Sequence, residues 1–156
     1  MLKTDCIFLE NELSDVERMF LSRPQTVEHT FLYKNGVFFN DFTVDGKKYS
    51  FKDVATPKDE VEYKRFERRY AKLGLYKILS KKYKEKLPWG ALTGIRPTKL
   101  CYTETESGRD YLKTLKEMQV SRENIRLTRD VLQAQEGIYE KKEGNVDVFV
   151  SLPFCP

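Results

Sequence analysis

The sequence predicts an α+β fold in which helices pack on an antiparallel β-meander. The dipeptides Asn35-Gly36 and Asp45-Gly46 each separate two apolar segments, and both tolerate the positive φ angles of tight hairpin turns. Between residues 58 and 86, apolar side chains recur at intervals of three and four, which is the period of an amphipathic helix. The length of 156 residues suits about one domain, and twenty aromatic residues can fill its core.

Residues 2–9 predict a first strand, although polar and apolar residues alternate imperfectly there. Ser14-Asp15-Val16-Glu17 is a capping-box pattern, in which the serine oxygen and the glutamate carboxylate satisfy free amide donors. We therefore predict a short helix that starts at Ser14 and ends at Pro24.

The meander consists of three predicted strands, at residues 30–33, 37–44 and 47–51. Because side chains alternate between the two faces of a strand, one set should face the core. The candidates for this buried face are Phe38, Phe42, Val44, Tyr49 and Phe51.

A long helix follows, with Thr56 as its N-cap and Pro57 in its first turn. Its apolar stripe should face the sheet, Gly74 is a weak point within it, and Pro88 ends it. The stripe consists of Tyr63, Phe66, Tyr70, Leu73 and Ile78, with Lys77 at the same spacing.

Residues 87–100 predict a loop punctuated by glycine and proline, and two more helices follow. One contains residues 111–118, and the other starts with Ser121 as N-cap and ends near Gly144. Residues 146–152 alternate as a strand does and lead into Pro153-Phe154-Cys155-Pro156.

The composition excludes several classes of function. Cys6, Cys101 and Cys155 are far apart and odd in number, and His29 is the single histidine, so we expect no disulfide framework and no metal site closed by this chain alone. We interpret His29 as a structural residue and expect the chain by itself to catalyse nothing. No apolar run approaches the roughly 20 residues of a membrane span, and no signal peptide is recognisable, so we expect a cytoplasmic protein.

Positive charge gathers in one segment. Between Lys58 and Lys86 there are 11 basic and five acidic residues, against a formal net charge of +4 for the whole chain. A basic helix interleaved with tyrosines suits RNA. The alternative is an ordinary amphipathic helix whose charged face is solvated, and no RNA-binding or DNA-binding motif accompanies it.

The loop from Thr93 to Lys99 is a second candidate site. Gly94 allows close approach of the backbone to a ligand, and Arg96 offers a planar fork for a carboxylate or phosphate. The alternative is a rigid turn in which Trp89 fills the core and Arg96 caps helix carbonyls.

The segments 87–100 (LPWGALTGIRPTKL) and 148–156 (VFVSLPFCP), with two helices between them, closely resemble the N-terminal part of HemZ-type coproporphyrinogen III dehydrogenases. These oxygen-independent enzymes belong to the radical S-adenosylmethionine (SAM) group. The resemblance covers roughly residues 87–156. It implies that residues 1–145 form an N-terminal accessory domain, and that residues 146–156 are the truncated first strand of a radical SAM (β/α) barrel.

In this family Pro-Phe-Cys-Pro opens a C-x3-C-x2-C motif that holds a [4Fe-4S] cluster, so the resemblance implies that Cys155 is the first of three ligands. The cluster binds SAM, and the full-length enzyme converts two propionates of coproporphyrinogen III to vinyl groups during haem biosynthesis. A reductant protein is the implied partner. We expect no cluster in the fragment alone. Arg96 and Lys99 are candidate substrate contacts because their charge suits propionates.

Two other readings remain open. The helix from Lys64 to Lys86 could make the chain an RNA-binding accessory module. Related oxidases often carry Tyr and His or Gly where this chain has Phe149 and Ser151, which leaves open a haem-chaperone-like radical SAM relative.

Overall fold

The computed structural model describes residues 2–22, 24, 26–94 and 96–138. A four-stranded sheet and five helices in this part of the chain confirm the α+β class. The elements in order are β1 (Leu2–Thr4), α1 (Ile7–Arg18), β2 (Val27–Lys34), β3 (Val37–Val44), β4 (Lys47–Val54), α2 (Glu60–Tyr83), α3 (Pro97–Glu106), α4 (Tyr111–Glu117) and α5 (Arg122–Gln135).

The sheet contains the predicted meander and one strand more. Its order is β1-β2-β3-β4; β2, β3 and β4 pair antiparallel, whereas β1 pairs parallel with β2. Both hairpin turns have positive φ at each central residue, with 51° and 76° at Asn35 and Gly36, as a type I′ turn requires. The meander prediction is therefore confirmed, and β1 makes the sheet mixed.

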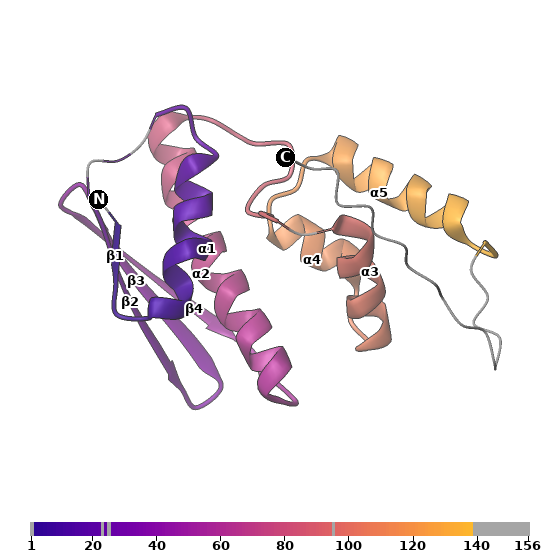
Figure 1. Ribbon diagram of the computed structural model, residues 1–156, viewed down its shortest axis with the longest axis horizontal. Coiled ribbons are helices and arrows are strands. Elements are labelled where there is room, and N and C mark those ends of the chain that lie inside the picture. Colours follow the sequence, from indigo (N-terminus) through magenta and orange to yellow (C-terminus); the bar gives the residue numbers. More distant parts are fainter. Residues whose placement is uncertain (1, 23, 25, 95, 139–156) are drawn as a thin grey trace, which may run out of the picture.

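Helices α1 and α2 lie on one face of the sheet (Figure 1). Phe38, Phe42 and Val44 point from β3 into this interface and are at most 2% exposed. A Cβ added to Gly74 of α2 would lie 2.8 Å from the ring of Phe42. The glycine therefore allows helix and sheet to approach closely at this point, and is more than a weak point in the helix.

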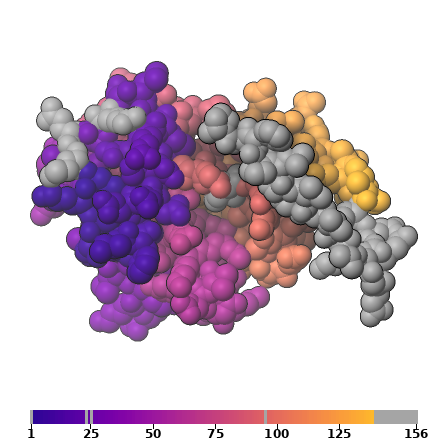
Figure 2. Space-filling view, viewed as in Figure 1, coloured from indigo at the N-terminus to yellow at the C-terminus, as the bar shows by residue number. Residues whose placement is uncertain are grey.

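Helix α2 occupies the middle of the molecule, with the sheet on one side and α3, α4 and α5 on the other (Figure 1). In the space-filling view, the N-terminal elements and the C-terminal helices accordingly gather at opposite ends (Figure 2). One core cluster joins both ends, because it includes Leu9 of α1, Leu79 of α2 and Leu115 of α4. None of the described helices is both long and apolar enough to cross a membrane.

The N-terminal prediction is wrong in its boundaries. The first strand stops at Thr4, and α1 begins at Ile7 with Cys6 as N-cap, so Ser14 lies inside the helix. The reason is an apolar stripe at helical spacing that starts before Ser14 and is at most 2% exposed. This stripe consists of Leu9, Leu13, Val16 and Phe20.

Both predicted ends of α2 are also displaced. The N-cap is Asp59 and not Thr56, because the Asp59 carboxylate accepts a hydrogen bond of 2.7 Å from the Glu62 amide. The helix ends at Tyr83, where Lys84 adopts a left-handed conformation with φ of 55°, and Pro88 lies beyond this cap.

The segment 87–100 is a loop only as far as Arg96, because α3 begins at Pro97 and was not predicted. The two further helices are confirmed as α4 and α5, with Ser121 capping α5. The prediction that the last helix extends to Gly144 is wrong, since α5 ends at Gln135. The predicted strand at 146–152 and the domain boundary at 145/146 lie outside the described residues.

The turn at residues 88–91 is tied to the α4–α5 connection. The Ala91 amide donates to the Met118 carbonyl at 2.9 Å, and the Ser121 amide donates to the Pro88 carbonyl at 2.9 Å. Gly90 has φ of +57°, and an added Cβ would lie 2.1 Å from the Met118 carbonyl oxygen. No side chain fits at this position, which explains the glycine. Trp89 packs on the core beside this turn.

Candidate functional site

A groove of about 630 Å³ separates α2 from α3 and from the loop that precedes α3. It exists because no Cα atom of α2 comes within 8 Å of one in α3, although both are fully described. Five basic side chains against two acidic ones make the groove positive. It is lined by Glu12, Asp15, Val61, Lys64, Arg65, Arg68, Arg69, Lys72, Leu92, Thr93, Gly94, Leu100 and Met118.

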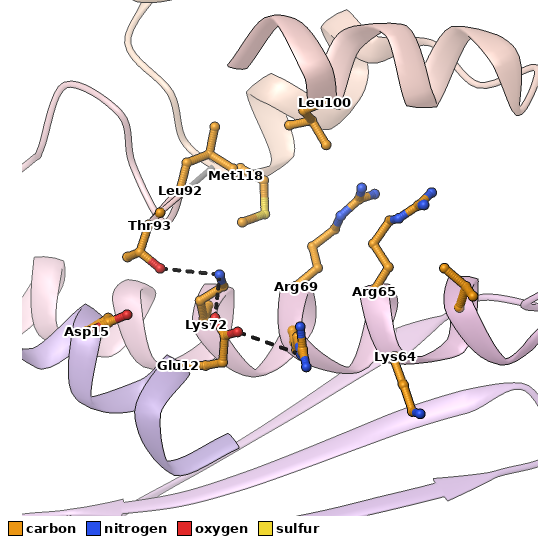
Figure 3. A pocket seen from close by; sticks show the side chains of 13 residues that line it. Glu12, Asp15, Lys64, Arg65, Arg69, Lys72, Leu92, Thr93, Leu100 and Met118 are labelled. Carbon is orange, nitrogen blue, oxygen red and sulfur yellow. Dashed lines mark hydrogen bonds and ion pairs between the residues drawn. The ribbon is translucent and has the colours of Figure 1, made fainter. Parts of the chain in front are cut away.

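Lys72 joins three elements at one end of the groove (Figure 3). Its Nζ atom lies 2.8 Å from a carboxylate oxygen of Glu12 in α1 and 3.2 Å from the hydroxyl of Thr93. Arg68 lies 3.6 Å from the other oxygen of Glu12. The Lys72 side chain is only 5% exposed, so this lysine serves packing and charge pairing within the fold.

Behind the groove, Glu104 of α3 is a fully buried carboxylate that receives several donors. Arg69 of α2 donates to it at 2.6 Å, Arg109 at 3.1 Å and the Thr114 hydroxyl at 2.9 Å. Arg109 also pairs with Glu62 of α2. These side chains connect α2 to α3 and α4 across the gap between their backbones.

Burial alone would raise the pKa of Glu104, but hydrogen bonds from Arg69, Thr114 and Arg109 outweigh that effect and lower it to about 2. Glu104 is therefore ionised at neutral pH. Its charge is balanced by the two arginines, and so the network does not add a net negative charge beneath the groove.

Arg65 differs from its neighbours on α2. Figure 3 shows Arg65 and Arg69 both projecting from α2 toward α3, but no carboxylate of the described residues lies within 4.0 Å of Arg65. The side chain is half-buried. It is thus a guanidinium that the fold directs into the groove without neutralising it.

Apolar side chains line the side of the groove opposite α2. Leu92, Leu100 and Met118 contribute to this wall from the loop before α3, from α3 and from the end of α4. The described lining contains no histidine or cysteine. The arrangement suits binding of an amphipathic anion, whose charge would meet α2 and whose apolar part would meet the opposite wall.

The residues predicted to contact substrate lie near the groove but do not line it. Arg96 is the N-cap residue of α3, with no side-chain capping bond, and is exposed; Lys99 is exposed in the first turn. Thr93 and Gly94 of the same predicted loop do line the groove. Among the residues that the structure describes, no helix carbonyl accepts a hydrogen bond from the Arg96 side chain.

The basic helix is not a uniformly solvated face. Arg69 and Lys72 are buried in ion pairs, so a solvated charged face is the wrong description of these two residues. The same pairing removes them from the surface that the RNA-binding alternative requires. Glu12 and Glu104, their partners, were not recognised from the sequence because they lie on other helices.

The described cysteines offer no place for an iron–sulfur cluster. No group of three or more histidine, cysteine, aspartate or glutamate side chains in the described part of the chain could hold a metal ion. Cys101 is buried, and burial raises the pKa of its thiol to about 11. The Cys6 thiol lies 3.7 Å from a Glu67 oxygen, and burial followed by that carboxylate raises its pKa. Cys155 lies outside the described residues.

His29 has a structural position. It is 2% exposed, and its two ring nitrogens lie 3.0 Å from the Asn40 side-chain oxygen and 2.9 Å from the Thr4 hydroxyl. Burial lowers its pKa. The side chain links β2 to its two neighbouring strands, β1 and β3.

Fold and groove define an α+β domain with a basic groove that has apolar side chains on one wall. Part of the chain is similar to a curated protein, the oxygen-independent coproporphyrinogen-III oxidase-like protein HemZ of Bacillus subtilis (strain 168). The two are 33% identical over 76 residues, which is 44% of this chain and 15% of that protein. No family model and no solved structure matches the chain.

Proposed function

We propose that this chain is the N-terminal part of a radical SAM protein of the coproporphyrinogen III dehydrogenase group. Residues 1–145 form its accessory domain, and residues 146–156 open its catalytic barrel. The single observation that carries the proposal is the pair of motifs at 87–100 and 148–156. The partial similarity to HemZ supports a relation to this group at a coarse level.

In this proposal Cys155 is the first of three thiolates that hold a [4Fe-4S] cluster in the longer protein. When bound, the cluster and SAM supply the radical chemistry that oxidatively decarboxylates two propionates of coproporphyrinogen III. A reductant protein supplies electrons, and the protein works in the cytoplasm. The contribution of the described residues is to fold the accessory domain and to present its groove.

The test is anaerobic reconstitution of the longer protein with iron and sulfide. The wild type should turn brown and convert coproporphyrinogen III to protoporphyrinogen IX in the presence of SAM, a reductant for the cluster and an added acceptor for the electron that each substrate radical releases with CO2. Cys155→Ala should abolish both the cluster absorbance and the reaction.

Cys6→Ser and Cys101→Ser are the matched controls, since both remove a thiol far from the motif in sequence, and both should retain the cluster. A cluster that survives Cys155→Ala would contradict the proposed ligand. A Cys155-dependent cluster with no turnover of coproporphyrinogen III, together with haem binding, would instead favour the haem-chaperone reading suggested by Phe149 and Ser151.

A further inference from the structure

We propose that the groove between α2 and α3 binds carboxylate arms of a tetrapyrrole, with Arg65 as the main anchor. The choice of a tetrapyrrole rests on the proposed function. The chemical class, an apolar body that carries carboxylates, rests on the groove itself.

The charge argument depends on which cations the fold has already neutralised. Lys72 is paired with Glu12, Arg69 with Glu104, and Lys64 lies 2.7 Å from Glu60. Arg65 has no such partner among the described residues, although it is half-buried beside Arg69. An incoming carboxylate would meet a partly desolvated guanidinium whose planar fork can donate two parallel hydrogen bonds.

The groove wall opposite α2 also favours a ligand with an apolar body. Leu92 and Leu100 are each 8% exposed and offer a small hydrocarbon surface to the groove, and Met118 lines the same wall at 1% exposed. A ring edge that carries a carboxylate on a short arm satisfies both walls at once. A phosphate or a sugar would leave the apolar wall uncovered.

Size is the third argument. A groove of about 630 Å³ falls within the range of roughly 300–1,000 Å³ that is typical of small-molecule sites. After the ion pairs described above, the charge of Arg65 and part of the charge of Arg68 remain, because Arg68 shares its single partner Glu12 with Lys72, and these two guanidiniums suit a ligand that carries more than one carboxylate.

The experiment is a fluorescence titration of the 156-residue chain with coproporphyrin III, the stable oxidised form of a four-carboxylate tetrapyrrole. We expect saturable binding that Arg65→Glu weakens at least tenfold. Lys81→Glu is the matched control, because it makes the same change of charge at an exposed position of α2 away from the groove. Its affinity should stay within twofold of the wild type.

Two further arms identify the ligand class. Coproporphyrin III tetramethyl ester has the same ring without charges and should bind at least tenfold more weakly. If Arg65→Glu fails to fold by circular dichroism, Arg65→Gln removes the charge with a smaller change and should also weaken binding at least tenfold.

Absence of saturable binding, or equal binding by Arg65→Glu and the wild type, would overturn the inference. Arg65-dependent binding of a single-stranded RNA oligonucleotide in place of coproporphyrin III would overturn it as well. If the 156-residue chain does not bind coproporphyrin III but the longer protein has a Cys155-dependent cluster and turnover, only the inference about the groove is refuted. The proposed function is then unaffected. Saturable binding of coproporphyrin III by the 156-residue chain, with no Cys155-dependent cluster in the longer protein, would refute the proposed function. It would still support the groove as a site for carboxylates.

Discussion

Glu104 illustrates how single side chains connect the two ends of this molecule. It is completely buried and receives hydrogen bonds from Arg69 of α2, from Arg109 and from Thr114 of α4. Removing one member of a buried ion pair leaves its partner charged and unpaired in a medium of low dielectric constant.

Glu104→Gln should therefore lower the free energy of unfolding by about 3–5 kcal/mol, since Arg69 would lose its counter-charge and Arg109 would keep only Glu62. Urea unfolding followed by circular dichroism measures this quantity. Glu106→Gln is the control, because Glu106 is exposed in the last turn of the same helix, and it should change stability by no more than about 0.5 kcal/mol. Equal effects of the two substitutions would show that the network contributes nothing to stability.

The ionisation of Glu104 should also make the stability of the chain depend on pH. The pKa of Glu104 is about 2 in the folded chain against an ordinary value of 4.5, so its stabilising contribution is complete above pH 4.5 and declines as the pH falls toward 2. The stability difference between the wild type and Glu104→Gln should narrow by about 2 kcal/mol between pH 6 and pH 3. Urea midpoints measured across this interval test it, and a constant or widening difference would contradict it.

At the scale of single residues, the sequence did not indicate that the side chains of Arg69 and Lys72 are buried. Both look like members of a solvated basic face when only neighbours on the same helix are considered. Their partners are Glu104 and Glu12, which are 35 and 60 residues away in the sequence. Local spacing contains no information on such pairs, so burial of these charges could not be predicted.

At the scale of elements, prediction succeeded where the signal is local. The two hairpins follow from Asn35-Gly36 and Asp45-Gly46, whose conformation depends on the turn residues themselves. Ser121 was identified as the N-cap of α5 for the same reason, since its hydroxyl accepts from the Asn124 amide within one turn.

Prediction failed where two local signals competed. Ser14 carries a capping-box pattern, yet the apolar stripe that begins at Leu9 buries more surface and extends the helix back to Ile7. Thr56 and Asp59 are both acceptable N-caps, and Asp59 forms the capping bond. Helix α3 was missed because Gly94 and Pro97 were interpreted as loop residues, whereas Pro97 occupies the first turn of the helix.

Gly90 yields the prediction that belongs to this scale. Gly90→Ala would place a methyl group against the Met118 carbonyl at a left-handed backbone position, and should destabilise the chain by about 3 kcal/mol or more through clash and strain together. Thermal unfolding measures the loss.

Gly94→Ala is the matched control, because Gly94 has φ of +60° with open space around it. It carries only the cost of the backbone conformation, about 1 kcal/mol. If Gly90→Ala and Gly94→Ala lower stability equally, close packing of the 88–91 turn on the α4–α5 connection is not the reason that position 90 requires glycine.

At the scale of the molecule, the central position of α2 should govern local stability. Residues around most of the circumference of its middle part are buried, whereas Thr128 is the one buried side chain of α5, a helix described over its whole length. Local opening requires less free energy where fewer apolar contacts are broken. Hydrogen–deuterium exchange should therefore show amides of α5 exchanging at least tenfold faster than those in the middle of α2. Equal protection would indicate that the chain opens only as a whole.

The class of fold was predictable at this scale, but the arrangement was not. Composition and periodicity sufficed for an α+β domain, since they report how many elements of each kind can form. The parallel pairing of β1 with β2, and the groove between α2 and α3, depend on which distant elements meet. Of the predicted site loop from Thr93 to Lys99, Thr93 and Gly94 line that groove, while Arg96 and Lys99 do not.

The burial of α2 on both sides also has an evolutionary consequence. A surface helix tolerates replacement on one face, so its substitution pattern repeats about every 3.6 residues. In α2 the sheet constrains Phe66 and Gly74, while α1 and the C-terminal helices constrain Arg69 and Lys72 on the other sides. Homologous chains should therefore diverge slowly through residues 69–80 of α2, where no side chain is exposed, without the helical rhythm of variable sites, and the fastest-changing positions should lie on α5.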